Sequence, residues 1–192
     1  MIAIIKYNGG NVSSVQNSLN RLNVESVVTD DFDLIRKADK VIFPGVGEAS
    51  STMKLLKEKG LDQLIPTLKQ PVLGVCLGMQ LMCKNNEEGN TVGMGIFDID
   101  VKKFPAKNIV PHMGWNTISD FKSEIFSGIE ENSDVYFVHS FYCELSENTT
   151  SVCDYILPFS ASLQKDNFYA MQFHPEKSGD VGSRLLENFL KQ

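Results

Sequence analysis

The segment Pro71-Val-Leu-Gly-Val-Cys76-Leu-Gly-Met-Gln-Leu-Met82 joins a predicted strand to a predicted helix. Its first part is a short apolar run after a proline, which is typical of a buried strand, and its last part has apolar residues at helical spacing. Cys76 lies at the junction, with Gly74 two residues before it and Gly78 two residues after it. This is the pattern of a nucleophile elbow, a sharp strand-to-helix turn that exposes a reactive side chain, with cysteine in the place of serine.

Such a turn favours a reactive thiol. The glycines leave room where the backbone crowds, and the N-terminus of the following helix offers free N–H groups and partial positive charge. The thiolate, which is the reactive form of cysteine, is stabilised there. The alternative interpretation is that Cys76 is a small buried hydrophobic residue, the usual role of a free cysteine. A base and an oxyanion hole elsewhere in the chain are needed to decide between the two.

The first half of the chain predicts strands that alternate with helices around this turn. Apolar runs predict strands at 2–6, 24–28 and 40–44, and helical spacing predicts helices over 12–22 and 49–59, the second ending at Gly60. A short helix capped by residues 30–33 and a helical piece at 61–68 complete the pattern. Strand and helix in alternation indicate an α/β fold with a parallel sheet.

The second half changes to short strands joined by turns. Residues 85–90 are polar and turn-like, and strands are predicted at 97–101, 113–118, 135–138, 141–144, 151–157, 160–164 and 168–173. The strands at 135–138 and 141–144 are close enough to form one long or bent strand. A helix over 180–190 ends the pattern. We therefore predict one α/β domain, residues 1–192, with a mainly parallel central sheet, helices on both faces and an antiparallel extension.

Composition excludes several classes of function. A net charge of −6 without a basic stripe argues against nucleic-acid binding, and no apolar run is long enough to cross a bilayer. The glycine turn near Asn11 lacks the spacing of a nucleotide-binding loop. The four cysteines show neither Cys-x-x-Cys pairs nor metal-ligand spacing, so we predict no metal site, no cofactor and a reducing, cytoplasmic location.

A base for Cys76 is predicted at the end of another strand. His174-Pro175-Glu176 follows the strand at 168–173, and carboxyl ends of parallel strands meet at the ligand crevice. Because Pro175 restrains the backbone, we predict a rigid extended segment in which His174 and Glu176 point the same way. Glu176 would then orient His174 toward Cys76 as nucleophile, base and orienter. The alternative is a structural histidine beside a solvated carboxylate.

His139 is an alternative candidate for the base. It ends the predicted strand at 135–138 and is followed by Ser140 rather than by a carboxylate. We interpret His139 as a structural or pocket-lining residue.

The strand at 40–44 leads into Gly45-Val46-Gly47, a candidate oxyanion-hole element. A glycine turn after a parallel strand presents backbone N–H groups, although a simple tight turn is the alternative interpretation. Beside a cysteine elbow, the N–H groups of Val46 and Gly47 join that of Leu77, the residue after the nucleophile, as predicted donors.

These motifs together resemble those of the class I, or triad, glutamine amidotransferases, over nearly the whole chain. In that family a cysteine thiolate attacks the side-chain amide of L-glutamine, ammonia leaves, and a glutamyl thioester is hydrolysed to glutamate. The resemblance implies that Cys76 is the nucleophile, His174 the acid and base, and Glu176 its orienter. It also implies that substrate is bound by Gly45, Gln80, Ser140 and Phe141.

Within that family, three segments are similar to the glutaminase subunits of imidazole glycerol phosphate synthase. They are Pro111-His-Met-Gly-Trp-Asn116, Tyr136-Phe-Val-His-Ser-Phe-Tyr142 and His174-Pro-Glu-Lys-Ser178. The resemblance implies that ammonia passes to a separate (β/α)8 cyclase subunit, forming imidazole glycerol phosphate and AICAR ribonucleotide in histidine biosynthesis. It also implies an interface with the cyclase at Met113, Trp115, Asn116, Tyr136 and Lys177. The alternative for Trp115 is a core residue.

Two positions depart from the pattern of these relatives. Lys6-Tyr7-Asn8 stands where Asp-Tyr-Gly is common, so the acidic residue is missing, and Glu48-Ala49 stands where Ala-Phe is common after the glycine turn. The second departure bears on the shape of the oxyanion loop. Neither touches the predicted triad.

Three other functions remain as alternatives. The first is the glutaminase of a different ammonia-using synthase, such as anthranilate synthase, which the segment around Trp115 disfavours. The second is a non-catalytic binding or chaperone module, which would not need His174-Pro-Glu176 at a strand end. The third is a flavodoxin-like electron carrier, for which no motif is present.

Overall fold

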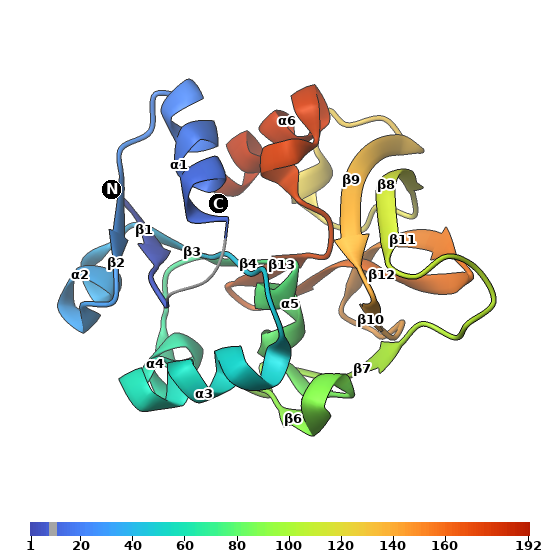
Figure 1. Cartoon of the computed structure of the whole chain (residues 1–192). Coiled ribbons are helices and arrows are strands. Elements are labelled where there is room, and N and C mark those ends of the chain that lie inside the picture. Colours follow the sequence, from blue (N-terminus) through green and yellow to red (C-terminus); the bar gives the residue numbers. More distant parts are fainter. Residues whose placement is uncertain (8–10) are drawn as a thin grey trace.

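The computed structural model describes residues 1–7 and 11–192 and is built on a seven-stranded sheet (Figure 1). The strand order is β11-β12-β13-β4-β3-β1-β2. Strands β1 to β4 and β13 run parallel, and β12 is antiparallel to both of its neighbours. The strands are β1 (Ile2–Ile5), β2 (Ser26–Thr29), β3 (Lys40–Phe43), β4 (Val72–Val75), β11 (Thr149–Tyr155), β12 (Leu157–Lys165) and β13 (Phe168–Met171). The predicted parallel sheet with an antiparallel extension is confirmed.

Helices cover both faces of this sheet because its strands are apolar on both sides. In β1, Ala3 and Ile5 face one hydrophobic core while Ile2 and Ile4 face the other. Helices α1 (Val12–Arg21) and α6 (Gly179–Leu190) pack on one face. Helices α2 (Phe32–Lys37), α3 (Ala49–Lys59), α4 (Leu61–Leu64) and α5 (Leu77–Met82) pack on the other (Figure 1). None of the helices within residues 1–7 and 11–192 has the length and apolarity needed to span a bilayer.

Helix ends follow the predicted signals. Asp31 caps α2 by accepting hydrogen bonds from the backbone N–H groups of Asp33 and Leu34. Gly60 ends α3 in the left-handed conformation, at φ 70°. The departure at Glu48 is also a helix cap, because its carboxylate accepts from the N–H groups of Ser50 and Ser51 at the start of α3. These hydrogen bonds, with the Ser50 hydroxyl first among them, lower the pKa of Glu48 to about 2. Asn8 lies outside the described residues.

The second half adds two smaller sheets to the central one. A four-stranded sheet has the order β10-β7-β5-β6, and β8 pairs with β9 in a separate antiparallel ribbon. Their bounds are β5 (Cys83–Asn86), β6 (Thr91–Val92), β7 (Phe97–Lys103), β8 (His112–Ile118), β9 (Ser133–His139) and β10 (Phe141–Cys143). Short 3-10 helices lie at η1 (Ile65–Thr67), η2 (Glu88–Asn90), η3 (Glu124–Phe126) and η4 (Pro175–Lys177).

Two predictions for this half are wrong. Residues 85–90 are predicted to be turn-like, but Asn85 and Asn86 belong to β5, which pairs with both β6 and β7. The segments at 135–138 and 141–144 do not form one continuous strand, because the chain leaves β9 at Ser140 and joins a different sheet through β10.

Three neighbouring strands of the central sheet end at the same edge. Phe43 of β3 pairs with Gly74 of β4, and Met171 of β13 pairs with Val75 of β4. The residues that follow these strands therefore emerge side by side. They are the glycine turn at 45–47, Cys76, and the segment that leads to His174.

Candidate active site

Cys76 occupies the turn between β4 and α5 in a strained backbone conformation. Its φ is 53° and its ψ is −110°, a backbone conformation that residues other than glycine rarely adopt. Cys76 directly precedes the first residue of α5. The turn is tight enough to need glycine beside it. A Cβ atom on Gly78 would lie 2.1 Å from the carbonyl oxygen of Phe43, and one on Gly74 would lie 3.0 Å from the backbone nitrogen of Met79. The predicted elbow geometry is present.

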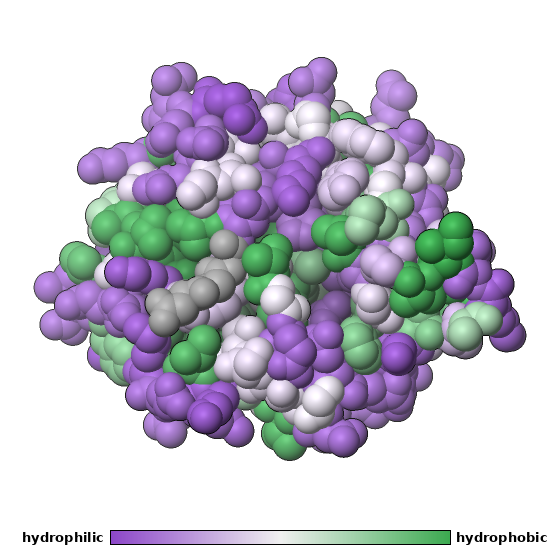
Figure 2. All heavy atoms as spheres, viewed as in Figure 1, coloured by the Kyte–Doolittle hydropathy of each residue, from purple (hydrophilic) through white to green (hydrophobic). Residues whose placement is uncertain are grey.

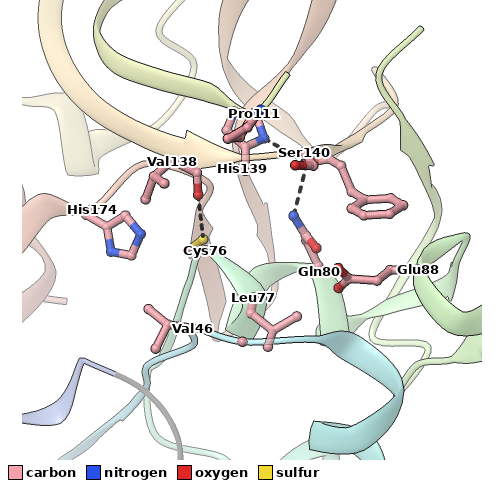
Figure 3. Close-up of a pocket in the computed structure, with 12 residues that line it drawn as sticks. Val46, Cys76, Leu77, Gln80, Glu88, Pro111, Val138, His139, Ser140 and His174 are labelled. Atoms are coloured by element: carbon pink, nitrogen blue, oxygen red, sulfur yellow. Dashed lines mark hydrogen bonds between the residues drawn. The ribbon is translucent and has the colours of Figure 1, made fainter. Parts of the chain in front are cut away.

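The structure brings His174 and Glu176 to this turn. The Nδ1–H of His174 donates to Oε1 of Glu176 across 2.8 Å, and both side chains are 1% exposed. In Figure 3 a ring nitrogen of His174 points toward the sulfur of Cys76. Asn11, at the start of α1, donates a further hydrogen bond of 3.1 Å to Glu176 Oε1. The three side chains of the predicted triad therefore converge.

The backbone route to this contact differs from the prediction. Pro175–Lys177 forms the 3-10 helix η4 rather than an extended segment. Ser178 stabilises that turn, since its hydroxyl donates to the carbonyl of His174 across 2.7 Å. Glu176 thus reaches His174 by folding back, because proline restrains φ equally well at the start of a helical turn.

Charges around His174 decide its protonation. Burial lowers the pKa of this imidazole, but the Cys76 sulfur and the Glu176 carboxylate outweigh burial and raise the pKa to about 10. At neutral pH the ring is therefore an imidazolium. A charged imidazolium beside a cysteine is the arrangement that activates a cysteine nucleophile.

A cavity of about 360 Å³ opens in front of Cys76 (Figure 3). The sequence-predicted residues that line it are Val46, Gly47, Cys76, Leu77, Gln80, His139, Ser140, Phe141 and His174. Gly45 does not line the cavity. It packs against the start of α5, where a Cβ atom would lie 2.3 Å from the nitrogen of Gly78. Gly45 therefore supports the elbow rather than facing the cavity.

Tyr7 holds the start of the glycine turn in place by a hydrogen bond. The buried Tyr7 hydroxyl donates to the carbonyl of Pro44 across 2.6 Å, immediately before the turn. Burial raises the pKa of Tyr7, so it remains a neutral donor. Gly47 has a φ of 118°, which favours glycine at that position. Sequence reasoning did not assign a role to Tyr7.

Gln80 lines the cavity and holds the backbone of a neighbouring lining residue, Phe141, in place. Its Nε2 donates to the carbonyl oxygen of Phe141 and to Oε1 of Gln172, each across 3.0 Å. Gln80 is buried, and these bonds hold the backbone of Phe141, the residue that follows Ser140, against the cavity.

Glu88 is a cavity-lining residue that sequence reasoning missed. Its Oε2 accepts from the backbone N–H of Ala49 across 2.8 Å, and burial raises the pKa of its carboxyl. It belongs to η2, in the stretch interpreted as a polar turn. A single carboxylate in a turn carries no local signal, because its position in the cavity depends on the pairing of β5 and β6.

His139 and His112 form a buried chain beside the cavity. Nδ1–H of His139 donates to the carbonyl of Phe141 (2.7 Å), and Nδ1–H of His112 donates to Nε2 of His139 (2.9 Å). Asn116 Nδ2 donates to Nε2 of His112 (3.2 Å). Both ring nitrogens of His139 are thus engaged, which agrees with a structural and pocket-lining role.

A surface beside the triad exposes large apolar side chains. Met113 is 63% and Trp115 57% exposed, so the core alternative for Trp115 is wrong. The rings of Trp115 and Tyr136 lie 6.1 Å apart, and Nζ of Lys177 lies 5.9 Å from the Tyr136 ring centre. Figure 2 shows further apolar atoms over the loop between β7 and β8, where Ile109 is exposed. Contiguous exposed apolar surface is typical of interaction sites.

The fold and this site define a class I glutamine amidotransferase, and the chain belongs to that family. The family model described as "Glutamine amidotransferase class-I" matches residues 4–192. Within the class, the chain belongs with the HisH subunits of imidazole glycerol phosphate synthase. A protein of that description from Bacteroides fragilis is 61% identical, covering 99% of this chain and 98% of its own length. One from Bacteroides thetaiotaomicron is 58% identical, covering 98% of each.

Solved structures share the fold at low sequence identity. A structure described as a glutamine amidotransferase superimposes with a TM-score of 0.75 at 17% identity, covering 100% of this chain and 98% of that one. A glutamine amidotransferase from Thermotoga maritima has a TM-score of 0.67 at 16% identity, covering 99% and 82%. The predicted amidotransferase fold is confirmed.

Proposed function

We propose that this chain is the glutaminase subunit of imidazole glycerol phosphate synthase. It hydrolyses L-glutamine to glutamate and ammonia and passes the ammonia to a separate (β/α)8 cyclase subunit, which forms imidazole glycerol phosphate and AICAR ribonucleotide in histidine biosynthesis. The observation that carries the proposal is that Cys76 and His174 line one cavity, with His174 bonded to Glu176, in a chain whose relatives bear that subunit's name.

The chemistry begins at the sulfur of Cys76. The thiolate attacks the side-chain amide carbon of glutamine, and the C–N bond breaks as His174 transfers its Nε2 proton to the leaving nitrogen. Ammonia and a glutamyl thioester result. His174, now neutral, takes a proton from water, which attacks the thioester and releases glutamate and the thiolate. Glu176 holds the ring in position throughout and stabilises its charged form.

The cavity wall supports binding of substrate. The backbone N–H groups of Val46, Gly47 and Leu77 are the donors that we propose for the negative oxygen formed on attack. We assign the α-amino-acid end of glutamine to Ser140 and Phe141, whose backbone Gln80 holds in place. The Glu88 carboxylate lines the same cavity, and its charge complements the substrate's ammonium group.

The exposed surface beside the triad is the proposed cyclase interface. Met113, Trp115, Asn116 and Tyr136 lie on the β8–β9 ribbon, and Lys177 follows Glu176 directly. Exposed Met and Trp side chains are favoured anchors of protein interfaces. Lys177 supplies a cation for an acidic group on the partner. In this proposal the partner lies beside the triad, where ammonia is released.

Two further assignments accompany this function. We propose that residues 1–192 form a single domain, in support of which the two hydrophobic cores share the strands of one central sheet. We propose a cytoplasmic location, in support of which all four cysteines are free thiols.

Cys76→Ser in the complex with the cyclase tests the function. We expect glutamine-dependent synthesis to be lost and ammonia-dependent synthesis to remain, because ring closure belongs to the partner. Glutamate release and imidazole glycerol phosphate formation are measured separately, with Cys153→Ser, a cysteine outside the cavity, as the control. Loss of both activities in an intact complex contradicts the division of labour. Stimulation of glutamate release by a different synthase's subunit, and not by the cyclase, contradicts the partner.

A further inference from the structure

Gln172 presents a buried amide to the sulfur of Cys76. It follows β13, two residues before His174, and its side chain is fully buried. Its Nε2 lies 3.6 Å from Sγ of Cys76, within hydrogen-bonding distance of sulfur. Gln172 and His174 therefore both reach the nucleophile from the same strand end, while Phe173 between them packs into the core. The mechanism above gives Gln172 no role.

The orientation of this amide is fixed from one end by a backbone carbonyl. The carbonyl of Phe141 can only accept, so the atom that Gln80 turns toward it is nitrogen. The same nitrogen carries a second hydrogen, which it donates to Gln172. Gln172 must therefore turn its oxygen toward Gln80, and its nitrogen faces Cys76.

A backbone N–H fixes the same orientation from the other end. The N–H of Glu88 can only donate, and Oδ1 of Asn86 accepts it across 2.8 Å. The amide nitrogen of Asn86 then donates to Oε1 of Gln80 across 3.3 Å. Gln80 consequently has only its nitrogen left for Phe141 and Gln172. Two backbone groups that cannot be reversed thus agree on a donor, not an acceptor, at the sulfur.

We propose that Gln172 is a further catalytic residue, which stabilises the Cys76 thiolate by donating its amide hydrogen to the sulfur. The inference rests on the proposed function, in which Cys76 is the nucleophile. The carbonyl of Val138 also lies near the sulfur, at 3.8 Å, and it accepts from a thiol but cannot stabilise a thiolate. A hydrogen bond to a charged acceptor in a buried site is stronger than one to a neutral acceptor. The donation from Gln172 therefore favours the charged sulfur.

The same side-chain amides connect the Cys76 sulfur, by hydrogen bonds, to the backbone proposed to bind substrate. Gln80 donates both to Gln172, which contacts the sulfur, and to the Phe141 carbonyl at the cavity. The sulfur and the proposed substrate-binding backbone are thus held by one network.

Alkylation of Cys76 by iodoacetamide tests this role without glutamine or partner. The rate is measured against pH in the full chain, by mass spectrometry of the peptide that contains Cys76. Gln172→Met keeps the length of the side chain and removes the donor. We expect alkylation at neutral pH to slow about tenfold or more, with the pH profile displaced to higher pH. Asn188→Leu is the matched control, because it removes a buried amide that bonds to the carbonyls of Ile125 and Ser127 instead.

An unchanged pH profile in folded Gln172→Met overturns the proposal, as does an equal change in Asn188→Leu. A measurement on the unmodified chain covers the case in which the variant does not fold. The side-chain ¹⁵N–¹H signals of Gln172 are expected to shift as Cys76 titrates, and signals that ignore this titration overturn the proposal. If alkylation slows as expected in Gln172→Met but the complex of the unmodified chain with the cyclase releases no glutamate, the proposed function fails while the contact between amide and sulfur stands.

Discussion

The three histidines of this chain are all buried, yet their pKa values are shifted in opposite directions. His174, His112 and His139 are 1%, 3% and 5% exposed. Burial lowers the pKa of His112 to about 4 and, with smaller effects from neighbouring groups, that of His139 to about 3. The pKa of His174 is instead raised to about 10, against the effect of its own burial. Burial alone therefore does not predict how a histidine behaves.

The difference lies in the groups that each ring contacts. His112 and His139 contact each other, an amide and a carbonyl, none of which is charged. His174 lies between a carboxylate and a thiol. The neighbouring Cys76 sulfur and Glu176 carboxylate thus separate the proposed base from a structural pair.

The largest expected effect comes from making His174 resemble the other two. Glu176→Gln keeps an acceptor for Nδ1–H but removes the charge, so we expect glutaminase kcat in the cyclase complex to fall about 10³-fold or more, as when a triad carboxylate becomes an amide. NMR titration of the His174 ring should show its pKa falling toward those of His112 and His139. Glu187→Gln, on the exposed face of α6, is the control. A ring that stays protonated at neutral pH in Glu176→Gln would show that the carboxylate does not set its charge.

The second prediction concerns stability against acid. The unfolded chain binds protons at His112 and His139 near pH 6.5, whereas the folded chain binds them only near pH 4 and 3. The stabilisation is thus fully present above pH 6.5 and is lost as the pH falls toward 4. We expect each ring to cost about 2 kcal/mol of unfolding free energy between pH 7 and pH 5. For His174 the sign is reversed, since its contribution is present below pH 6.5 and is lost as the pH rises toward 10.

Urea unfolding at pH 7 and pH 5 measures this effect. The variant His112→Gln/His139→Gln retains hydrogen-bonding groups but cannot titrate, so its stability should change less over this interval than that of the parent chain. Equal changes in the two proteins would mean that carboxylates alone account for the acid sensitivity.

The smallest expected effect is at Asn11, which donates a hydrogen bond to the Glu176 carboxylate. Asn11→Ala removes one hydrogen bond to Glu176 and leaves its charge in place, so we expect kcat to fall about fivefold. The measurement is again glutamate release in the complex. Asn20→Ala, near the other end of α1, is the control. A loss as large as that of Glu176→Gln would mean that position, rather than charge, dominates the role of Glu176.

Local patterns were sufficient to predict which residues converge at the proposed catalytic centre. The elbow at Cys76 is defined by two glycines within five residues, and His174 and Glu176 are adjacent to one proline at a strand end. Such signals are contained in a few consecutive residues. The same holds for the first half of the fold, where apolar runs alternate with helical spacing and the parallel sheet follows.

The remaining parts depend on pairing between distant segments. Glu88 reaches the cavity only because β5 pairs with β6 and β7. Gln172 falls within the strand predicted at 168–173, and nothing in the local pattern distinguishes it from the other residues of that strand. Ser140 marks a change of sheet that no local composition signals. Trp115 is exposed although its residue type favours the core, and no local composition signals the pairing of β8 with β9 that brings it to the surface.

The fixed direction of the Gln172 amide has a consequence for the integrity of the protein itself. An enzyme that cleaves glutamine side chains keeps the amide nitrogen of one of its own glutamines 3.6 Å from Sγ of Cys76, the proposed nucleophile. Self-cleavage would require the carbonyl carbon to meet the sulfur and the oxygen to enter the oxyanion hole. Here nitrogen faces the sulfur, and the oxygen is occupied by Gln80. Orientation alone therefore distinguishes the resident amide from the substrate.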